Sequence, residues 1–417
     1  MIQHKYYILI LWLSLAFTAM GQEAMTAHPK EPVIEDSASF LRASLMIAEP
    51  THQHIQSSFG HAFLRMQCPS AALDYCFSME SGEYEDFLDI CTGNYPNRLV
   101  AVPTADYLQP FDHEGRTVTE YALNLRLEEM QHLWRFLDRT SLQGLSPYHD
   151  YFHHGCSQEI MRYLTLNLDG QLVYGDAAQQ YGNTLFLLGN QLLPANSWLH
   201  LPPSMLSTTD GTDRQLTDDE KTAFPCIIPT LLSDASIIDA DGSRRPILKD
   251  EAPIIYPPAQ HYAPNTAPPI YIWFLLALGV VLLISLLGVC YPVAPVHTVC
   301  NVLDGSLFTL YQLITFGTLL ICLFSTLPTT SGWNWNYLIY NPLPLLIWIY
   351  GKRHPLSAPR RANLYICYAL WLTAFMVIMF IVGGHFITEQ YLLALTFTVR
   401  CLFKAYEYRH STNTFNP

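Results

Sequence analysis

Two short stretches of this chain decide how its first half is interpreted. Residues 151–160 read YFHHGCSQEI, and residues 58–65 read SFGHAFLR. The first is typical of a loop that becomes a helix, with Cys156 in the first turn, where the positive end of the helix dipole favours a thiolate. The second is typical of the start of a strand, with His61 near its beginning. A histidine brought from a neighbouring strand would serve such a thiol as its base.

The composition indicates a soluble part joined to a membrane part. The chain has 417 residues, of which 50% are hydrophobic and 14% are charged, whereas a soluble domain has roughly 25% charged residues. The formal net charge is −13, with most of the acidic residues before residue 252. Because no run of basic residues resembles a nucleic-acid-binding surface, we expect no nucleic-acid partner.

The N-terminus has the pattern of a secretory signal. Lys5 precedes an apolar run from Tyr6 to Thr18, and the small residues Ala19 and Gly21 follow it. This order of basic, apolar and small residues predicts a signal peptide over residues 1–21. An uncleaved membrane anchor is the alternative. In either case the domain that follows is exported.

Residues 22–195 are predicted to form an exported α+β domain. Short strands are expected at Ala62–Met66 and Ala72–Ser78. Apolar residues at helical spacing predict a helix over Leu127–Asp138, and a second helix is expected over Ser157–Leu168. Strands that come first, with helices around them, favour an α+β fold over a doubly wound sheet.

Residues 196–269 are rich in Pro, Asp and Thr. The many prolines exclude long helices from this segment. We predict an extended exported subdomain that closes with a stalk leading to the membrane.

From Ile270 onward the composition becomes strongly apolar. Residues 270–404 predict an all-α transmembrane bundle of about five helices, and residues 405–417 a cytoplasmic tail. The predicted spans are Ile270–Cys290, Leu307–Phe324, Tyr337–Tyr350, Leu364–Val382 and Tyr391–Phe403.

The charges of the loops predict the orientation of these spans. The loop Gly351–Ala362 carries four basic residues, whereas the loops Ser325–Asn336 and Gly383–Gln390 carry no Lys or Arg. Basic loops remain in the cytoplasm. We therefore expect a multi-pass protein of the inner membrane whose exported domain lies on the periplasmic side.

Five of the ten cysteines precede the first predicted span: Cys68, Cys76, Cys91, Cys156 and Cys226. Cysteines tend to pair in an oxidising compartment, and an odd number leaves one over. Cys68 and Cys76 are close enough in sequence to bridge two neighbouring strands. Cys156 is either half of a disulfide or a free thiol, and catalysis more easily explains a free thiol in this compartment.

We predict Cys156 as a nucleophile and His61 as its base. Gly60, just before the histidine, indicates a close approach of the backbone, and a third polar group is expected to hold the imidazole in one tautomer. Candidates for an orienting or supporting role are Ser78, Glu80, Asp150, His154 and Gly155.

A zinc site is an alternative use of the histidines. It would combine His52, His54 and His61 with a cysteine. Their spacing matches no familiar zinc motif. We therefore predict neither a metal nor another cofactor.

The two opening stretches resemble the signature blocks of the Lnb-type family, which includes a lipoprotein N-acyltransferase. Other matching stretches bring the resemblance to about residues 41–400. They are residues 114–118 (EGRTV), 123–125 (LNL), 228–232 (IPTLL), 245–248 (RPIL), 334–338 (NWNYL) and 341–343 (NPL).

The resemblance implies a permuted papain-like domain, in which the strand with the histidine precedes the helix with the cysteine. It also implies that Cys156 takes a fatty acyl chain from a membrane phospholipid as a thioester. The acceptor would be the N-terminal amine of a diacylglyceryl-cysteine lipoprotein. On the membrane side, Asn334, Asn336 and Asn341 are the residues of the matching stretches that we consider as part of the site.

The chain departs from the family at two places. The family usually has Asn before the nucleophilic cysteine, whereas this chain has Gly155. Backbone N–H groups would then have to stabilise the oxyanion without that side chain. Leu327 also stands before Pro328, where a histidine is expected.

Two other functions compete with the acyltransferase. A cell-envelope cysteine peptidase or amidase would use the same pair of side chains, but it needs a water-open cleft and no membrane bundle. A non-catalytic membrane module would use Cys156 as a structural residue. The loss of activity in a folded His61→Ala variant would argue against the second of these.

Overall fold

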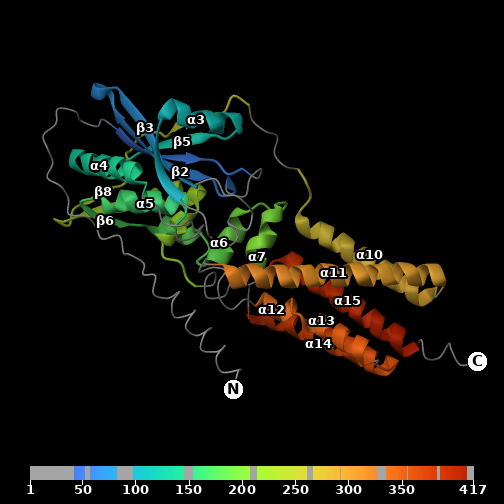
Figure 1. The fold of residues 1–417 in the computed structure, drawn as a ribbon. Coiled ribbons are helices and arrows are strands. Elements are labelled where there is room, and N and C mark those ends of the chain that lie inside the picture. The colour runs from blue at the N-terminus through green and yellow to red at the C-terminus, as the bar shows by residue number, and fades with distance from the viewer. Residues whose placement is uncertain are drawn as a thin grey trace, which may run out of the picture. The chain divides into compact units, whose positions relative to one another are not determined.

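The chain contains an α+β region followed by a helical region (Figure 1). This arrangement confirms the predicted α+β domain before an all-α part. The computed structural model describes residues 42–51, 57–81, 97–144, 154–206, 214–260, 266–291, 293–325, 335–354, 356–382 and 386–410.

A six-stranded antiparallel sheet forms the centre of the α+β region. In β2, Ala62 and Leu64 belong to one buried cluster and Phe63 to another, because successive side chains of a strand point to opposite faces. The predicted strands are confirmed as β2 (His61–Cys68), which is longer at both ends, and β3 (Leu73–Ser81), which begins one residue later and ends three residues later than predicted. In spatial order the strands are β4 (Asn97–Pro103), β3 (Leu73–Ser81), β2 (His61–Cys68), β1 (Arg42–Ala48), β5 (Val118–Ala122) and β9 (Ile254–Tyr256).

Helices cover both faces of this sheet (Figure 1). The helices α4 (Leu127–Gln143) and α5 (Cys156–Leu166) pack against the face that carries Leu64. The helix α3 (Thr104–His113) packs through Phe111 against the face that carries Phe63. The two helices predicted around residues 127–138 and 157–168 are therefore confirmed, and they share one face.

Residues beyond the predicted boundary at 195/196 share a core with those before it. Ile228, Ile237 and Ile247 belong to the same buried cluster as Leu64, and β9 adds a strand to the main sheet. A second antiparallel sheet pairs β6, from before the boundary, with β7 and β8. The elements of this part are β6 (Gly170–Val173), α6 (Leu185–Leu192), α7 (Leu201–Leu206), α9 (Ile228–Leu232), β7 (Ser236–Asp239) and β8 (Arg244–Pro246).

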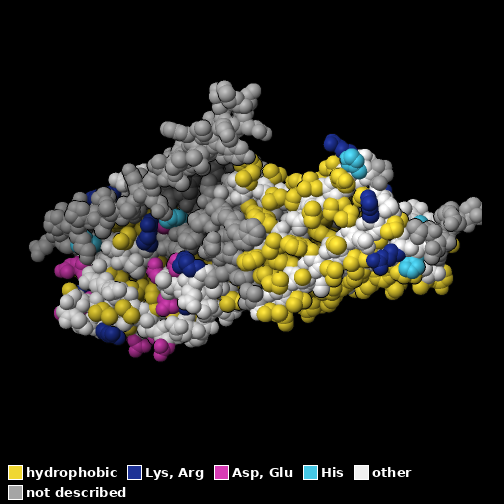
Figure 2. Space-filling model, turned by 90° about the horizontal axis from the view of Figure 1, so that it is seen from below, with side chains coloured by type: hydrophobic (Ala, Val, Ile, Leu, Met, Phe, Trp, Pro, Cys, Tyr) yellow, Lys and Arg dark blue, Asp and Glu magenta, His cyan; other side chains and the backbone are white. Residues whose placement is uncertain are grey.

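Among the described residues of the helical region, three helices are long and apolar enough to cross a membrane: α10 (Ile270–Cys290), α11 (Ala294–Phe324) and α14 (Ala358–Val382). Figure 2 shows a large hydrophobic surface over part of the molecule. The predicted count of about five spans stays a prediction, since α13 has 11 residues and α15 carries several charges. The elements are α10 (Ile270–Cys290), α11 (Ala294–Phe324), α12 (Asn336–Ile339), α13 (Leu343–Arg353), α14 (Ala358–Val382) and α15 (Thr388–His410).

The predicted span Tyr337–Tyr350 does not form one continuous helix. The helix ends at Ile339 and resumes at Leu343, because Pro342 lacks a backbone N–H and disfavours helical geometry in the residue before it. The hydroxyl of Tyr311 binds the interrupted backbone: it donates to the Ile339 carbonyl at 2.5 Å and accepts from the Asn341 N–H at 3.0 Å.

Candidate active site

Cys156 is the first residue of α5, as predicted, and Gly155 is the N-cap. The helix is held against the sheet by Ile160 and Leu164, which are fully buried in the core shared with β2 and β3. The half-buried thiol therefore lies at the positive end of a helix whose direction is set by packing.

His61 is the first residue of β2, where the backbone passes very close to β1. Gly60 has φ of +93°, and a Cβ atom there would lie 2.6 Å from the carbonyl oxygen of Ala48. Only glycine accommodates both the positive φ and this approach. The close backbone approach expected at Gly60 is confirmed, and it directs the chain into the strand that carries His61.

Three side chains surround the Nε2 atom of His61. Ser78 Oγ lies 2.8 Å away and Tyr107 Oη 3.1 Å away. The Oε1 atom of Glu80 lies 3.6 Å from Nε2 and accepts hydrogen bonds from both Ser78 and Tyr107. Since each hydroxyl has one proton and donates it to Glu80, both oxygens are left to accept from His61. We infer that Nε2 carries a proton and that Nδ1 is the nitrogen available to Cys156.

The pKa shifts describe a thiolate beside an imidazolium. Burial works against a charged His61, but the Cys156 thiolate and Glu80 raise the pKa of His61 to about 10. Burial also works against a charged Cys156, yet the charge and hydrogen bond of His61 and the backbone of Ala62 lower the pKa of this thiol below its usual value. Glu80 is half-buried. Burial works against its charged form, but the hydrogen bond and charge of His61 lower the pKa of Glu80 to about 2.

A cavity of about 290 Å³ opens beside this pair. Its lining includes His61, Glu80, Tyr107, Arg116 and Cys156. The cavity gives a second molecule access to a strong nucleophile with an adjacent proton donor, which is the arrangement that acyl transfer through a covalent intermediate requires.

Two family models match the chain. The model described as the Lnb N-terminal periplasmic domain matches residues 35–184, and the model described as the Lnb transmembrane domain matches residues 263–411. The chain belongs to the Lnb family. It is a membrane protein with a periplasmic domain. Comparisons with curated proteins and with solved structures found no match.

In this Lnb-family chain, only some of the residues predicted to support the thiol lie beside His61. Ser78 and Glu80 lie beside His61. His154 instead pairs with Glu159, with 2.8 Å between Nδ1 and Oε1, and its carbonyl accepts from the side chain of Asn97. Gly155 lines the cavity, whereas Asp150 lies outside the described residues.

The sequence interpretation missed Tyr107 and Arg116. Tyr107 lies on α3, and no local pattern connects it with a histidine 46 residues earlier. The available signal was the spacing of Tyr107 and Phe111, which places two aromatic rings on one face of a helix. Arg116 lies in a stretch that matches the family, at residues 114–118, but its sequence neighbours do not reveal that it lines the cavity.

The two described membrane-side asparagines make structural contacts. Asn336 is buried and donates to the Ser204 carbonyl at 2.9 Å, and it accepts from Gln390 at 2.9 Å. The side chain of Asn341 donates to the Leu338 carbonyl at 3.3 Å. Neither residue lines the cavity at Cys156, and Asn334 lies outside the described residues.

The proposed bridge between Cys68 and Cys76 is not formed. The reason is that Cys68 belongs to the core on one face of the sheet and Cys76 to the core on the other. Cys226 is free, and burial raises its pKa to about 11. Cys91 lies outside the described residues.

The zinc alternative would need His52 and His54, which also lie outside the described residues. Among the side chains that the structure does describe, no group of three or more His, Cys, Asp or Glu could hold a metal ion. His61 is instead surrounded by Ser78, Tyr107 and Glu80.

Proposed function

We propose that this chain transfers a fatty acyl group from a phospholipid to the N-terminal amine of diacylglyceryl-cysteine lipoproteins. The observation that carries the proposal is the placement of Cys156, in the first turn of α5, and of His61 in the lining of one open cavity. Each of the two side chains favours the charged form of the other. This pair belongs to a periplasmic domain joined to apolar helices, which supports substrates that are themselves anchored in lipid. The proposed location is the inner membrane, with Cys156 on the periplasmic side.

In the first step, the Cys156 thiolate attacks the carbonyl carbon of a phospholipid ester. The tetrahedral intermediate collapses when the bond to the glycerol oxygen breaks. The proton on Nδ1 of His61 passes to that oxygen, which leaves as the hydroxyl of a lysophospholipid. The products are an acyl thioester on Cys156 and a neutral His61.

In the second step, the amine of the lipoprotein attacks the thioester carbonyl. His61 takes a proton from the nitrogen, the carbon–sulfur bond breaks, and an amide forms. The thiolate and the imidazolium are thereby restored. Nε2 stays bound to Ser78 and Tyr107 throughout, so the ring keeps its orientation while the proton on Nδ1 moves.

The oxyanion of both steps needs hydrogen-bond donors. Gly155 has no side chain to supply one, so we assign this role to backbone N–H groups at the start of α5, beginning with that of Cys156. N–H groups in the first turn of a helix lack partners within the helix and lie at the positive end of its dipole. In this proposal the domain is papain-like and permuted, with the strand of His61 before the helix of Cys156.

Arg116 supports a phospholipid as the acyl donor. It is 5% exposed, and its guanidinium donates to the Glu49 carbonyl at 2.8 Å and to Glu114 at 3.0 Å. Its Nη2 atom has no hydrogen-bond partner in the part of the chain that the structure describes. A buried N–H group without a partner is costly, and an anionic phosphate group at this end of the cavity would satisfy it.

The test is mass spectrometry of lipoprotein N-termini from cells that depend on this chain for N-acylation. We expect triacylated lipoproteins with the unchanged chain and diacylated ones with Cys156→Ala or His61→Ala. Cys226→Ser is the matched control, since it removes another half-buried thiol, one whose pKa is raised and that does not line the cavity, and it should leave N-acylation unchanged.

Unchanged triacylation in the Cys156→Ala cells would overturn the proposal. If the purified chain instead released peptide from cell-wall fragments in a Cys156-dependent reaction, a cysteine peptidase or amidase would replace it. If both activities were absent and the variants folded normally, a non-catalytic membrane module would be the remaining hypothesis.

A further inference from the structure

A second cavity lies among the helices α11, α13, α14 and α15 and has a volume of about 470 Å³. Lys352 and Arg361 line it near the end of α13 and the start of α14, and Arg400 and Lys404 line it from the second half of α15. Figure 2 shows Lys and Arg side chains at one end of the hydrophobic surface. The loop charges predict that this end of the helices faces the cytoplasm.

Two of the four cations in this cavity are neutralised by the protein itself. Arg400 lies 2.5 Å from Asp304 and 3.0 Å from Glu407. Lys404 lies 2.6 Å from Asp304 and 3.0 Å from Glu407. Each cation therefore contacts both carboxylates, and this group of four has no net charge.

The other two cations, Lys352 and Arg361, have no carboxylate partner among the described residues. Lys352 Nζ lies 5.5 Å from the centre of the Trp348 ring. Arg361 lies 5.8 Å from the centre of the Tyr408 ring and donates to the Leu356 carbonyl at 3.1 Å. Aromatic rings and carbonyls position a cation without neutralising it. The cavity consequently keeps the positive charge of two side chains.

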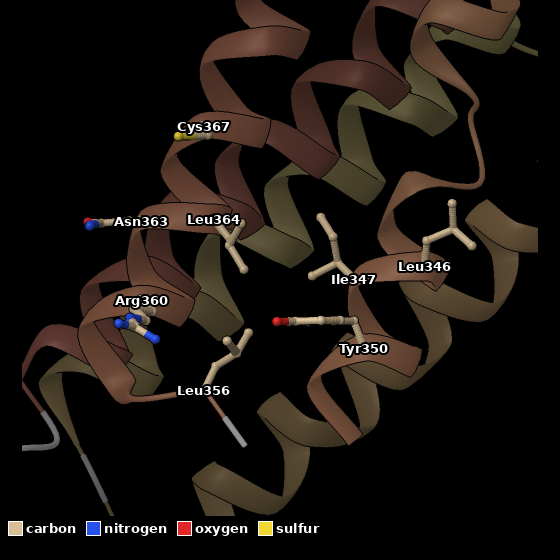
Figure 3. Close-up of a pocket in the computed structure, with 8 residues that line it drawn as sticks. All are labelled: Leu346, Ile347, Tyr350, Leu356, Arg360, Asn363, Leu364 and Cys367. Carbon is tan, nitrogen blue, oxygen red and sulfur yellow. The ribbon is translucent and has the colours of Figure 1, made fainter. Parts of the chain in front are cut away.

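A largely apolar cavity of about 600 Å³ adjoins the charged one, and the two share Ile347, Leu356 and Leu364. Figure 3 shows Ile347 and Tyr350 of α13 and Leu364 of α14 pointing toward the space between these helices. Apolar walls at the surface of membrane-spanning helices favour a hydrocarbon chain over water. The pair of cavities thus combines a cationic part with an apolar part.

We propose that these two cavities bind one phospholipid with an anionic headgroup, of the phosphatidylglycerol type. The lipid phosphate lies between Lys352 and Arg361, and one acyl chain lies between α13 and α14. A soluble anion would pair with the two cations but leave the apolar cavity empty, whereas a lipid matches both parts. This site is independent of Cys156, because all described residues of its lining come from the helical region.

The test is native mass spectrometry of the full chain, purified in detergent and stripped of lipid. Phosphatidylglycerol, phosphatidylcholine and inorganic phosphate are the three probes. We expect one phosphatidylglycerol molecule to be retained, with at least about tenfold preference over phosphatidylcholine, since each cation near the membrane surface contributes about 1 kcal/mol. Excess inorganic phosphate should not displace it.

The decisive variant is Lys352→Gln/Arg361→Gln, for which we expect the preference to fall about tenfold. The matched control is Arg353→Gln/Arg409→Gln, which removes two positive charges from the same end of the helices but from residues that do not line either cavity. A second variant, Leu364→Trp, fills the passage between the cavities without changing charge and should also weaken retention.

Three outcomes would overturn the proposal. Equal losses in the two charge variants would show that the lipid senses only the general surface charge. Equal retention of the two lipids would show that the cations do not bind the headgroup. Displacement by inorganic phosphate would show that a soluble anion is the ligand. Thermal unfolding of each variant identifies any loss of binding that results from misfolding.

Discussion

Two groups of buried or half-buried charges lie in different regions of this chain, and they are built differently. In the periplasmic domain, the pKa of His61 is raised and that of Cys156 is lowered, because each of these two side chains stabilises the charged form of the other. In the helical region, Asp304 and Glu407 each contact both Arg400 and Lys404. The comparison teaches that a buried group of charges indicates catalysis where it contains a nucleophile. Such a group indicates a structural role where every charge is paired with an opposite one.

The largest expected effect comes from removing the nucleophile. Cys156→Ser should lower acyl transfer to a diacylated lipopeptide by at least about a thousandfold, because a hydroxyl beside His61 is far less ionised than a thiol. The check is the transfer rate of the purified full chain, with Cys226→Ser as the control. A comparable rate in the Cys156→Ser variant would mean that Cys156 forms no thioester.

A large effect of a different kind is expected in the helical group. Arg400→Met should leave stability lower by about 3–5 kcal/mol, because two carboxylates lose a buried partner. Unfolding of the purified protein in detergent measures this loss. Adding Asp304→Asn should restore part of it by removing one unpaired carboxylate. Full stability in the Arg400→Met variant would mean that Asp304 and Glu407 do not need Arg400 as an ion-pair partner.

Cys156 and Cys226 should differ in how their rates of alkylation depend on pH. His61 lowers the pKa of Cys156 and so favours its thiolate, whereas burial raises the pKa of Cys226 to about 11. Iodoacetamide should therefore modify Cys156 at least about tenfold faster near neutrality. The rate at Cys156 should fall as the pH drops through its lowered pKa, and the ion pair should be lost as the pH rises through about 10, where His61 loses its proton. Peptide mass spectrometry measures both sites in one sample.

The smallest effects are expected at the residues around Nε2. Glu80→Gln should lower acyl transfer about tenfold, and Tyr107→Phe less, since these groups orient His61 without touching the substrate carbonyl. Loss of the Glu80 charge also lowers the pKa of His61, so the upper pH limit of the ion pair should move downward. An unchanged pH profile in Glu80→Gln would show that Glu80 does not stabilise the imidazolium.

Local patterns predicted much of the fold. Apolar spacing located α4, and the loop-to-helix pattern around Cys156 located α5. Short strands were expected at β2 and β3, and the apolar runs located α10, α11 and α14. Prediction failed where contacts between residues far apart in the sequence decide which segments pack together. The strand β9 and the core residues Ile228 and Ile247 lie in a proline-rich segment, yet they pack with the domain that precedes it. No periodicity within that segment indicates its partners.

The candidate site shows the same division. The sequence by itself determined that a thiol begins a helix, that a histidine begins a strand and that Gly60 allows a close backbone approach, because these features depend on neighbouring residues. Only the tertiary structure decided that Ser78, Glu80 and Tyr107 meet at Nε2 of His61 and that Cys68 and Cys76 face opposite sides of the sheet. The physical reason is that hydrogen bonding and charge stabilisation act over a few ångströms, and packing of the sheet and its helices brings those residues within that range.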